Sequence, residues 1–494
     1  MKYAETLKKV TDNITSTQNG DVAFKSYGDK IVDMFYKIGA LREQESHVAK
    51  LKIEECYKEN PEATSKILLY ARDIRNGMGE RSVVRDAIVE LSENHPNTML
   101  NLVSLLPEIG RWDDVIYIWY HTKNQALKDS ILVALKQILK MEENKEVEQS
   151  LLAKWLPSEN ATNKHTILMA KALRKALGMT PRNYRKMLTK MRSNLNLVEN
   201  NLRTREYEKI NYEQVPSLAH LKYECAFEKN DNERYTKYLD NVNSGKSKMN
   251  TQTLTPFDII RKIDVNFFDA LEDAHTLNLA WDNLPDVFEG KTLNAIVACD
   301  VSGSMHGDHL YCSVGLAIYM AQRNKGAFHN YFIDFCGNSR MHQLKEGANI
   351  VKLYKQVTES SEDCNTNMDS VFNALLRGAT YMQAKQEDLP EYIIIVSDMQ
   401  FDQVRGYDTA FERAKKNFEE AGYKLPTVIF WNVNLLEDTI PATSEDNVIL
   451  VSGRSQNVIK ELINVAEAKI TDNRDLTRFI ISNICKSYEV NIVD

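Results

Sequence analysis

The sequence predicts a multidomain protein, with an N-terminal α-helical array at residues 1–285 and a C-terminal α/β domain at residues 291–494. Two observations lead to this prediction. The chain has 494 residues, whereas a single hydrophobic core seldom extends beyond roughly 250 to 300 residues. Apolar residues recur at helical spacing before about residue 285, and short β-rich runs alternate with helical stretches after it.

In the N-terminal part the apolar positions follow the helical period, as in Ile31, Met34 and Phe35. Short polar or glycine-bearing stretches interrupt the pattern, among them residues 76–79 and 178–181. These breaks divide the region into helices of ordinary length joined by short turns. We therefore expect antiparallel helix pairs. No strict sequence period establishes a repeat.

The C-terminal part has five short runs rich in β-branched and aromatic residues, at 293–298, 327–333, 392–396, 427–431 and 448–451. Helical stretches separate these runs, and such alternation is typical of a parallel sheet with helices on its faces. Residues 281–290, which include Pro285, form the expected linker between the two parts.

Composition excludes several classes of protein. The seven cysteines are scattered and contain no Cys-x-x-Cys pair, so neither a disulfide framework nor a zinc cage is expected. No stretch approaches the ~20 consecutive apolar residues of a membrane helix, and the N-terminus lacks the apolar core of a signal peptide. We expect a cytoplasmic protein with no membrane partner.

Oxygen-bearing side chains follow two of the predicted strands. Asp300, Ser302 and Ser304 form an Asp-x-Ser-x-Ser turn after the first strand, and Asp398 follows the strand at 392–396. Thr366 begins a helical stretch after a polar loop. Ligands of open α/β sheets bind at the carboxyl ends of strands, so we expect these five side chains to meet there, with Asp300 in a surface loop. Hard cations prefer such oxygen ligands, which predicts a site for Mg²⁺, with Mn²⁺ or Ca²⁺ as alternatives.

Other interpretations of this turn stay open. In one, Asp300 caps the next helix and the serines line an ordinary turn. In another, the chain is an Mg²⁺-dependent phosphoester enzyme that uses Asp300 and Asp398. An aspartyl phosphatase needs a second Asp two residues after the first, and Ser302 stands there, which argues against covalent phosphoryl chemistry.

Basic residues are concentrated in one segment. Residues 161–210 hold 12 Lys and Arg against 3 Asp and Glu, whereas the chain as a whole has a net charge of −7. Residues 291–494 account for this entire −7, with 20 basic and 27 acidic residues. A local excess of cations in an otherwise neutral helical array is typical of a surface that follows a phosphate backbone. A solvated helix face is the alternative.

Thr180 and Pro181 predict a helix start, because Thr is a good N-cap and Pro suits the first helical position. The spacing places Met187, Leu188 and Met191 on the inner face of this helix and its cations outside. Tyr184 is expected to be available for stacking on a base. The predicted RNA-binding residues are Lys164, Lys171, Arg174, Lys175, Arg182, Tyr184, Arg185, Lys186, Lys190 and Arg192.

Two further motifs stand in the helical part: Arg72-Asp-Ile-Arg-Asn-Gly-Met-Gly-Glu-Arg81 and Gly110-Arg-Trp-Asp-Asp114. Together with Tyr184-Arg-Lys186, they resemble the uncharacterised plant, phage and viral relatives of the TROVE module of the Ro ribonucleoprotein autoantigen. The Asp-x-Ser-x-Ser turn with Thr366 and Asp398 resembles the metal-ion-dependent adhesion site of von Willebrand factor A domains.

The resemblance implies a ring of HEAT-like helices closed by a von Willebrand A-type domain, in a protein that binds RNA. For the two motifs themselves, a structural role is the favoured interpretation. In this interpretation Arg72, Arg75, Glu80 and Arg81 form ion pairs between helices around a glycine turn, and Trp112 belongs to the core.

The favoured hypothesis is a non-enzymatic RNA-binding protein. The basic helical surface would bind structured or single-stranded RNA, and the metal domain would recruit a protein or close the ring. A site with two carboxylates, hydroxyls and waters leaves a coordination position for an acidic side chain of a protein partner. The alternative is a metal-dependent protein adaptor or scaffold that does not bind RNA.

Overall fold

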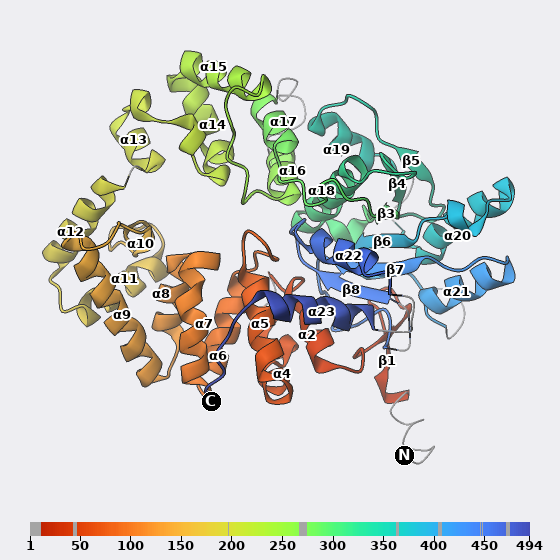
Figure 1. Cartoon of the computed structure of the whole chain (residues 1–494), viewed down its shortest axis with the longest axis horizontal. Coiled ribbons are helices and arrows are strands. Elements are labelled where there is room, and N and C mark those ends of the chain that lie inside the picture. The colour runs from red at the N-terminus through yellow and green to blue at the C-terminus, as the bar shows by residue number, and fades with distance from the viewer. Residues whose placement is uncertain are drawn as a thin grey trace.

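The computed structural model describes residues 11–42, 47–195, 197–265, 274–361, 365–403, 408–444, 446, 448–470 and 475–494. The predicted fold class is confirmed: a helical N-terminal part is followed by an α/β domain built on one six-stranded sheet. In Figure 1 the helices follow a curved path that begins and ends at the α/β domain. Among the described residues, no helix is both long and apolar enough to cross a membrane.

The helical path begins with α2 (Lys30–Ile38), α3 (His47–Leu51), α4 (Ile53–Glu59), α5 (Pro61–Arg72), α6 (Ser82–Leu91), α7 (Pro96–Ile109), α8 (Trp112–His121) and α9 (Gln125–Glu143). It continues with α10 (Leu152–Trp155), α11 (Lys164–Ala176), α12 (Pro181–Asn194), α13 (Val198–Thr204), α14 (Ser217–Asn230), α15 (Asn232–Asn243), α16 (Pro256–Val265) and α17 (His275–Asp282). Two 3₁₀ turns, Tyr207–Lys209 and Tyr212–Gln214, precede α14.

Helix starts follow from local sequence chemistry. Asn60, Asn124, Asn163 and Thr180 each cap a helix by accepting a hydrogen bond from a backbone N–H of its first turn. At α12 the predicted start is confirmed, because Thr180 is the N-cap and Pro181 is the first helical residue.

The sheet has the strand order β5-β4-β3-β6-β7-β8. Its strands are β3 (Ala295–Cys299), β4 (Tyr331–Asp334), β5 (Met341–Gln343), β6 (Tyr392–Ser397), β7 (Thr427–Asn432) and β8 (Val448–Ser452). All neighbouring pairs are parallel except the edge pair β4 and β5. Residues 293–298, 392–396, 427–431 and 448–451 overlap strands as predicted, whereas the run at 327–333 becomes a strand only at Tyr331. Strand β5 was not predicted.

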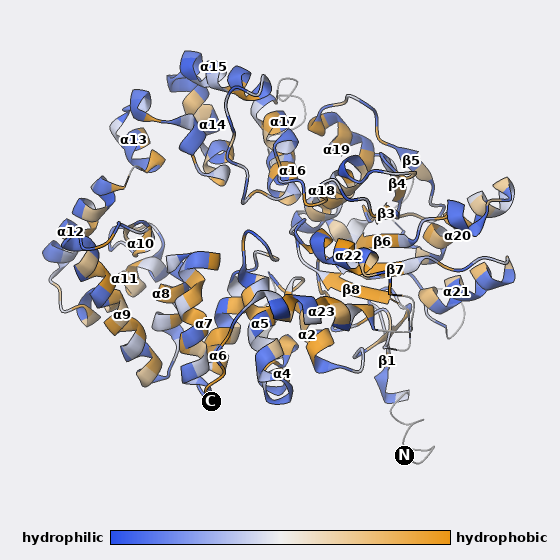
Figure 2. Cartoon of the chain, viewed as in Figure 1, coloured by the Kyte–Doolittle hydropathy of each residue, from blue (hydrophilic) through white to orange (hydrophobic). Residues whose placement is uncertain are grey.

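Helices α18 (Asp308–Arg323), α19 (Ile350–Thr358), α20 (Met368–Met382), α21 (Ala410–Glu420), α22 (Val458–Glu467) and α23 (Leu476–Ser487) alternate with the strands. Strands β3 and β8 are buried along their whole length, as expected for a sheet covered on both faces. Figure 2 shows hydrophobic residues concentrated in the neighbouring strands β6, β7 and β8. The register aligns Cys299 of β3 with Val396 of β6, so these two strands end side by side.

Both ends of the helical path pack against the α/β domain (Figure 1). At the start, the hairpin of β1 (Ile14–Ser16) and β2 (Val22–Phe24) bonds to the loop before β8, and α2 lies against β8. At the end, α16 lies against α18. The loop after β8 contacts both, because Asn457 Nδ2 donates to the Gly77 carbonyl at 3.3 Å and Gln456 Nε2 donates to the Leu254 carbonyl at 3.1 Å. The chain thus forms a closed ring.

Candidate functional site

The two carboxylates of the predicted metal site lie directly after neighbouring strands. Asp300 follows β3, and its carboxylate accepts hydrogen bonds from the Ser302 N–H at 2.9 Å and from Ser397 Oγ at 2.6 Å. Asp398 follows β6, and its Oδ1 accepts a bond from the Gln400 N–H at 3.2 Å. Both residues are fully buried, so the expectation of a surface loop was wrong for Asp300.

The hydroxyl groups complete an oxygen-rich cluster. Ser302 Oγ and Ser304 Oγ lie 3.2 Å apart, with Ser302 buried and Ser304 exposed. Thr366 is buried and is held by Asp402: the Thr366 N–H donates to Asp402 Oδ2 at 2.7 Å, and the Asp402 N–H donates to the Thr366 carbonyl at 3.0 Å. Direct hydrogen bonds therefore join Ser302 to Asp300 and to Ser304, whereas Thr366 is bonded to Asp402 in the loop after β6.

The electrostatics of this cluster suit a cation. Burial raises the pKa of Asp300, and burial together with the neighbouring Asp300 carboxylate raises the pKa of Asp398 to about 7. Asp398 Oδ2 is buried and makes no hydrogen bond of normal geometry in the described part of the chain. A divalent cation would neutralise the two carboxylates and give this oxygen a partner. The donor set is thus compatible with a hard cation such as Mg²⁺.

The described residues contain no group of three or more His, Cys, Asp or Glu side chains placed to hold a metal ion. A cation bound here would depend on two carboxylates, hydroxyls and water, which is typical of Mg²⁺ rather than of zinc.

Residues around this cluster were not found from the sequence. Ser397 and Asp402 hold Asp300 and Thr366, and the N-terminal hairpin supports the loop after β6. Thr17 Oγ1 donates to the Phe401 carbonyl at 2.8 Å, and Asn19 Nδ2 donates to Asp402 Oδ1 at 3.2 Å. Asp402 could have been found from the sequence, because it is a carboxylate only four residues after Asp398. The hairpin contacts are separated by more than 380 residues, and no local pattern could have indicated them.

The predicted basic surface is formed by α11 and α12. Six cations are exposed, and no ion pair of the described residues involves any of them: Lys164, Lys171, Lys175, Arg182, Arg185 and Lys186. We call these six the basic face. As predicted, Leu188 and Met191 are buried beneath α12, and Met187 is partly buried.

Four other residues predicted to bind RNA have partners within the protein. Tyr184 is fully buried and donates to the Pro157 carbonyl at 2.8 Å, so the prediction of a stacking residue was wrong. Arg174 pairs with Glu159 at 2.8 Å, and Lys190 Nζ lies 3.7 Å from Glu143. The Arg192 guanidinium donates to the carbonyls of residues 153 and 156 and to a serine hydroxyl. Arg174 and Arg192 thus hold loops of the helical part.

The two motifs of the helical part form ion pairs, buried at Arg72 and partly exposed at Arg81, which confirms the structural interpretation for these two residues. Arg72 pairs with Asp114, Arg81 with Asp113, and Glu80 with Arg42. Arg75 instead donates to the Glu108 carbonyl.

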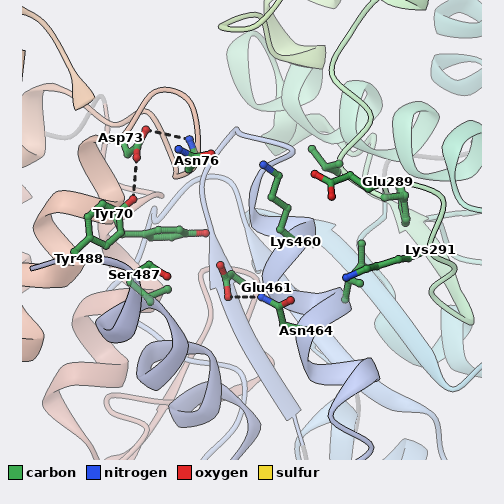
Figure 3. A pocket seen from close by; sticks show the side chains of 14 residues that line it. Tyr70, Asp73, Asn76, Glu289, Lys291, Lys460, Glu461, Asn464, Ser487 and Tyr488 are labelled. Carbon is green, nitrogen blue, oxygen red and sulfur yellow. Dashed lines mark hydrogen bonds between the residues drawn. The ribbon is translucent and has the colours of Figure 1, made fainter. Parts of the chain in front are cut away.

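A cavity of about 400 Å³ lies between the end of α5, the segment after α17, and helices α22 and α23, and Figure 3 shows the side chains that line it. Tyr488 donates to Asp73 Oδ2 at 3.0 Å, and Asn464 donates to Glu461 Oε2 at 3.3 Å. The lining also includes Glu289, Lys291 and Lys460 (Figure 3). Its carboxylates are at least as numerous as its amines, so this cavity does not favour a polyanion.

Comparisons with known proteins cover nearly the whole chain. Residues 17–133 and 129–287 match the model of a family described as a domain of unknown function (DUF2828), and residues 294–483 match a second domain of unknown function (DUF7788). An uncharacterised protein of Acanthamoeba polyphaga mimivirus, L728, is 30% identical over 497 residues, which cover 92% of this chain and 85% of the viral protein. The crystal structure of the Deinococcus radiodurans Ro (RSR) protein is similar with a TM-score of 0.49 and 11% identity, covering 94% of this chain and 100% of that chain.

Proposed function

The chain belongs to the DUF2828 family, and we propose that it is a non-enzymatic RNA-binding protein that contacts RNA phosphates through the basic face of α11 and α12. The resemblance of its sequence motifs to TROVE proteins agrees with this proposal. The observation that carries it is the charge distribution of these two helices.

Residues 161–198 contain nine Lys and Arg and no Asp or Glu. Seven of the nine are exposed, and six of these seven, the basic face, form no ion pair in the described part of the chain. Such a surface attracts a polyanion, and the release of counterions condensed on the RNA favours binding. The surfaces of soluble proteins normally intersperse both signs of charge. Six exposed cations without a carboxylate partner therefore favour an anion-binding face over one that is only solvated.

Flexible lysines and arginines that contact phosphates give affinity without reading bases. Since Tyr184 is buried, its ring is not available to stack on a base. The basic face would therefore bind structured or single-stranded RNA with little sequence preference, and other parts of the ring would supply selectivity.

We also propose that the oxygen cluster at Asp300 and Asp398 holds Mg²⁺ and serves a protein partner. The unsatisfied Asp398 Oδ2 supports this part of the proposal. Residues 291–494 carry the net charge of −7, so the field near this site repels RNA. An acidic side chain of a protein partner would complete the coordination of the cation. If the chain does not bind RNA, this site would make it a metal-dependent protein adaptor.

An electrophoretic mobility shift assay tests the RNA proposal with a triple variant, Lys171→Ala, Lys175→Ala and Lys186→Ala. The matched control is Lys352→Ala, Lys415→Ala and Lys416→Ala, which removes the same charge from exposed positions of the α/β domain. We expect the first variant to lose at least 10-fold in RNA affinity and the control to bind like the wild type. Equal affinity of both variants would leave the adaptor as the better function.

A further inference from the structure

A second cavity, of about 610 Å³, lies where the two ends of the helical path meet the α/β domain. Its volume lies within the roughly 300–1,000 Å³ of small-molecule sites. Its lining combines residues of the motif loop at 73–81, Arg111 before α8, Tyr117 within α8, and residues of the segment 253–258. The lining includes six arginines: Arg42, Arg72, Arg81, Arg85, Arg111 and Arg454.

The first part of the arginine cluster is built on one buried carboxylate. Asp114 Oδ2 accepts hydrogen bonds from Arg72 Nε at 2.9 Å and Nη2 at 2.7 Å, and from the Arg111 N–H at 2.9 Å. Asp114 Oδ1 accepts a bond from Arg85 Nε. Arg72 and Asp114 are both almost fully buried, so this carboxylate is already shared by two guanidiniums.

A second carboxylate, Asp113, is shared in the same way. Its Oδ2 lies 2.8 Å from Arg81 Nη2 and 3.0 Å from Arg85 Nη2, and its Oδ1 lies 3.4 Å from Arg111 Nε. Four guanidiniums, those of Arg72, Arg81, Arg85 and Arg111, thus share the two carboxylates of Asp113 and Asp114. The quartet has a formal charge of +2.

The other charged groups of the cavity do not remove this surplus. Arg42 pairs with Glu80 at 2.9 Å, and Arg454 pairs with Asp308 at 2.9 Å, so each of these arginines has a carboxylate. Asp258 is a further carboxyl group in the lining, and burial raises its pKa, which disfavours its negative form.

The crowding of positive charge contributes to lowered pKa values of two of the arginines. Burial, followed by the neighbouring Arg85 and Arg111, lowers the pKa of Arg81 to about 10. Burial also lowers the pKa of Arg111, and Arg72 and Arg85 add to this effect. An anion in the cavity would reverse both shifts, because an opposite charge favours the protonated guanidinium.

The cluster is held rigidly in place. The Arg111 guanidinium lies 4.6 Å from the centre of the Trp155 ring, and that of Arg85 lies 5.1 Å from the centre of the Tyr117 ring. Arg81 and Arg111 nevertheless remain accessible, with 45% and 29% of their side chains exposed. A preorganised, partly open pair of guanidiniums can bind an anion without paying much conformational entropy.

We propose that this arginine cavity binds a phosphate monoester, either a free mononucleotide or the terminal phosphate of an RNA. A monoester carries nearly two negative charges at neutral pH, which match the +2 of the quartet, and arginine forks suit its oxygens. The cavity exceeds the size of a bare phosphate and leaves room for the attached nucleoside. The site is separate from the basic face, and the proposal stands whether or not the basic face binds RNA.

Isothermal titration calorimetry with 5′-AMP, inorganic phosphate and adenosine tests the proposal on the full chain. We expect AMP to bind, adenosine to bind at least 10-fold more weakly, and AMP affinity to fall below about pH 6, where the phosphate loses its second charge. Failure of both AMP and phosphate to bind the wild type, or equal affinity for AMP and adenosine, would overturn the proposal.

Variants locate the site. Arg81→Gln, at an accessible position, should lower AMP affinity at least 10-fold, whereas Lys352→Gln, at an exposed position of the α/β domain, should leave it unchanged. Asp113→Asn raises the formal charge of the quartet to +3 and should tighten AMP binding, which a variant that merely misfolds would not do. Unchanged affinity in both Arg81→Gln and Asp113→Asn would contradict the assignment.

The source of the phosphate is distinguished by short RNAs with identical sequences and different ends. If the ligand is an RNA end, RNA with a terminal 5′ or 3′ phosphate should bind at least 10-fold more tightly than RNA with hydroxyl ends, and AMP should compete. If the ligand is a free nucleotide, AMP should bind and the RNA ends should make no difference. Either result supports a monoester site.

Discussion

At the scale of single residues, Asp114 is the carboxylate on which the arginine cluster depends. It accepts hydrogen bonds from Arg72, Arg85 and the Arg111 N–H. Gly110 leaves room for these groups, since a Cβ there would lie 2.8 Å from Arg72 Cζ. Arg72 of the first motif and Gly110 and Asp114 of the second are therefore parts of one packing arrangement.

Replacing Asp114 with Ala should destabilise the protein strongly, by about 3–5 kcal/mol, because it leaves the buried Arg72 without a counterion. The matched control is Asp113→Ala, which removes the same charge from a partly exposed residue whose partners include the exposed Arg81. We expect a smaller loss there. Thermal unfolding of both variants checks this, and similar melting temperatures would contradict the central role of Asp114.

A second prediction concerns Asp398, whose Oδ2 makes no normal hydrogen bond in the described structure. Mg²⁺ at 100 times its Kd should stabilise the wild type by about 2.7 kcal/mol. Asp398→Asn should abolish this gain, and in chelator it should be at least as stable as the wild type because one of two adjacent buried negative charges is gone.

Thermal unfolding with and without Mg²⁺ measures this effect. The control, Asp129→Asn, changes the charge equally at an exposed position of α9 and should respond to Mg²⁺ as the wild type does. A full Mg²⁺ response in Asp398→Asn would remove Asp398 from the metal site.

Single residues also show what the sequence could not predict. Tyr184 stands in a run of cations, and we expected its ring to be exposed. The side chain is instead buried, and its hydroxyl donates to the Pro157 carbonyl. Its partner lies 27 residues away, so helical periodicity alone carried no information about it. Arg174 and Arg192 were misjudged for the same reason, because their partners come from a neighbouring loop.

At the scale of elements, local chemistry predicted much more. Helix α12 starts at Pro181 behind the Thr180 cap and buries Leu188 and Met191, as the sequence indicated, because caps and periodicity are local properties. Strand β5 was not predicted, since Met341–Gln343 is short, mostly exposed and lacks an apolar run. It forms only because β4 offers an edge with which to pair.

Helix α14 provides a prediction about pH. His220 is almost fully buried, its Nε2 bonds to the Tyr212 carbonyl at 3.0 Å, and its Nδ1 has no partner among the described residues. Burial lowers its pKa to about 4, whereas an unfolded His titrates near 6.5. The unfolded state therefore binds more protons between these values, and stability must fall as the pH is lowered from about 6.5 to 4.

This loss is at most about 3 kcal/mol, at 1.36 kcal/mol for each pKa unit. His220→Gln keeps a side-chain N–H donor and cannot titrate, so it should lose less stability over the same pH range. Thermal unfolding at several pH values compares the two proteins. Parallel pH profiles of wild type and His220→Gln would contradict a buried, neutral histidine.

At the scale of the whole molecule, the ring brings distant motifs together. The loop after β8 bonds to Gly77 at the start of the helical path and to Leu254 near its end. The arginine cavity is formed at this junction, with Arg454 of the α/β domain in its lining. Local sequence patterns predicted the fold class and the order of the two parts. They could not predict these contacts, because the contacting residues are far apart in the chain.

Ring closure also separates the charges of the molecule. The acidic α/β domain, with its net −7, is joined to a helical part whose net positive charge is concentrated at residues 161–210. Because exposed charges more than about 8–10 Å apart are screened at physiological salt, RNA near α11 and α12 would experience mainly the local positive field.

The salt dependence of RNA affinity tests the proposed function most directly. Filter binding of a single-stranded RNA at several salt concentrations gives a log–log slope of about 0.7 for each phosphate neutralised. The variant Lys171→Ala, Lys175→Ala and Lys186→Ala should flatten the slope of the wild type by about two units and weaken binding at low salt. The same slope and affinity in the variant and the wild type would contradict RNA binding through the basic face.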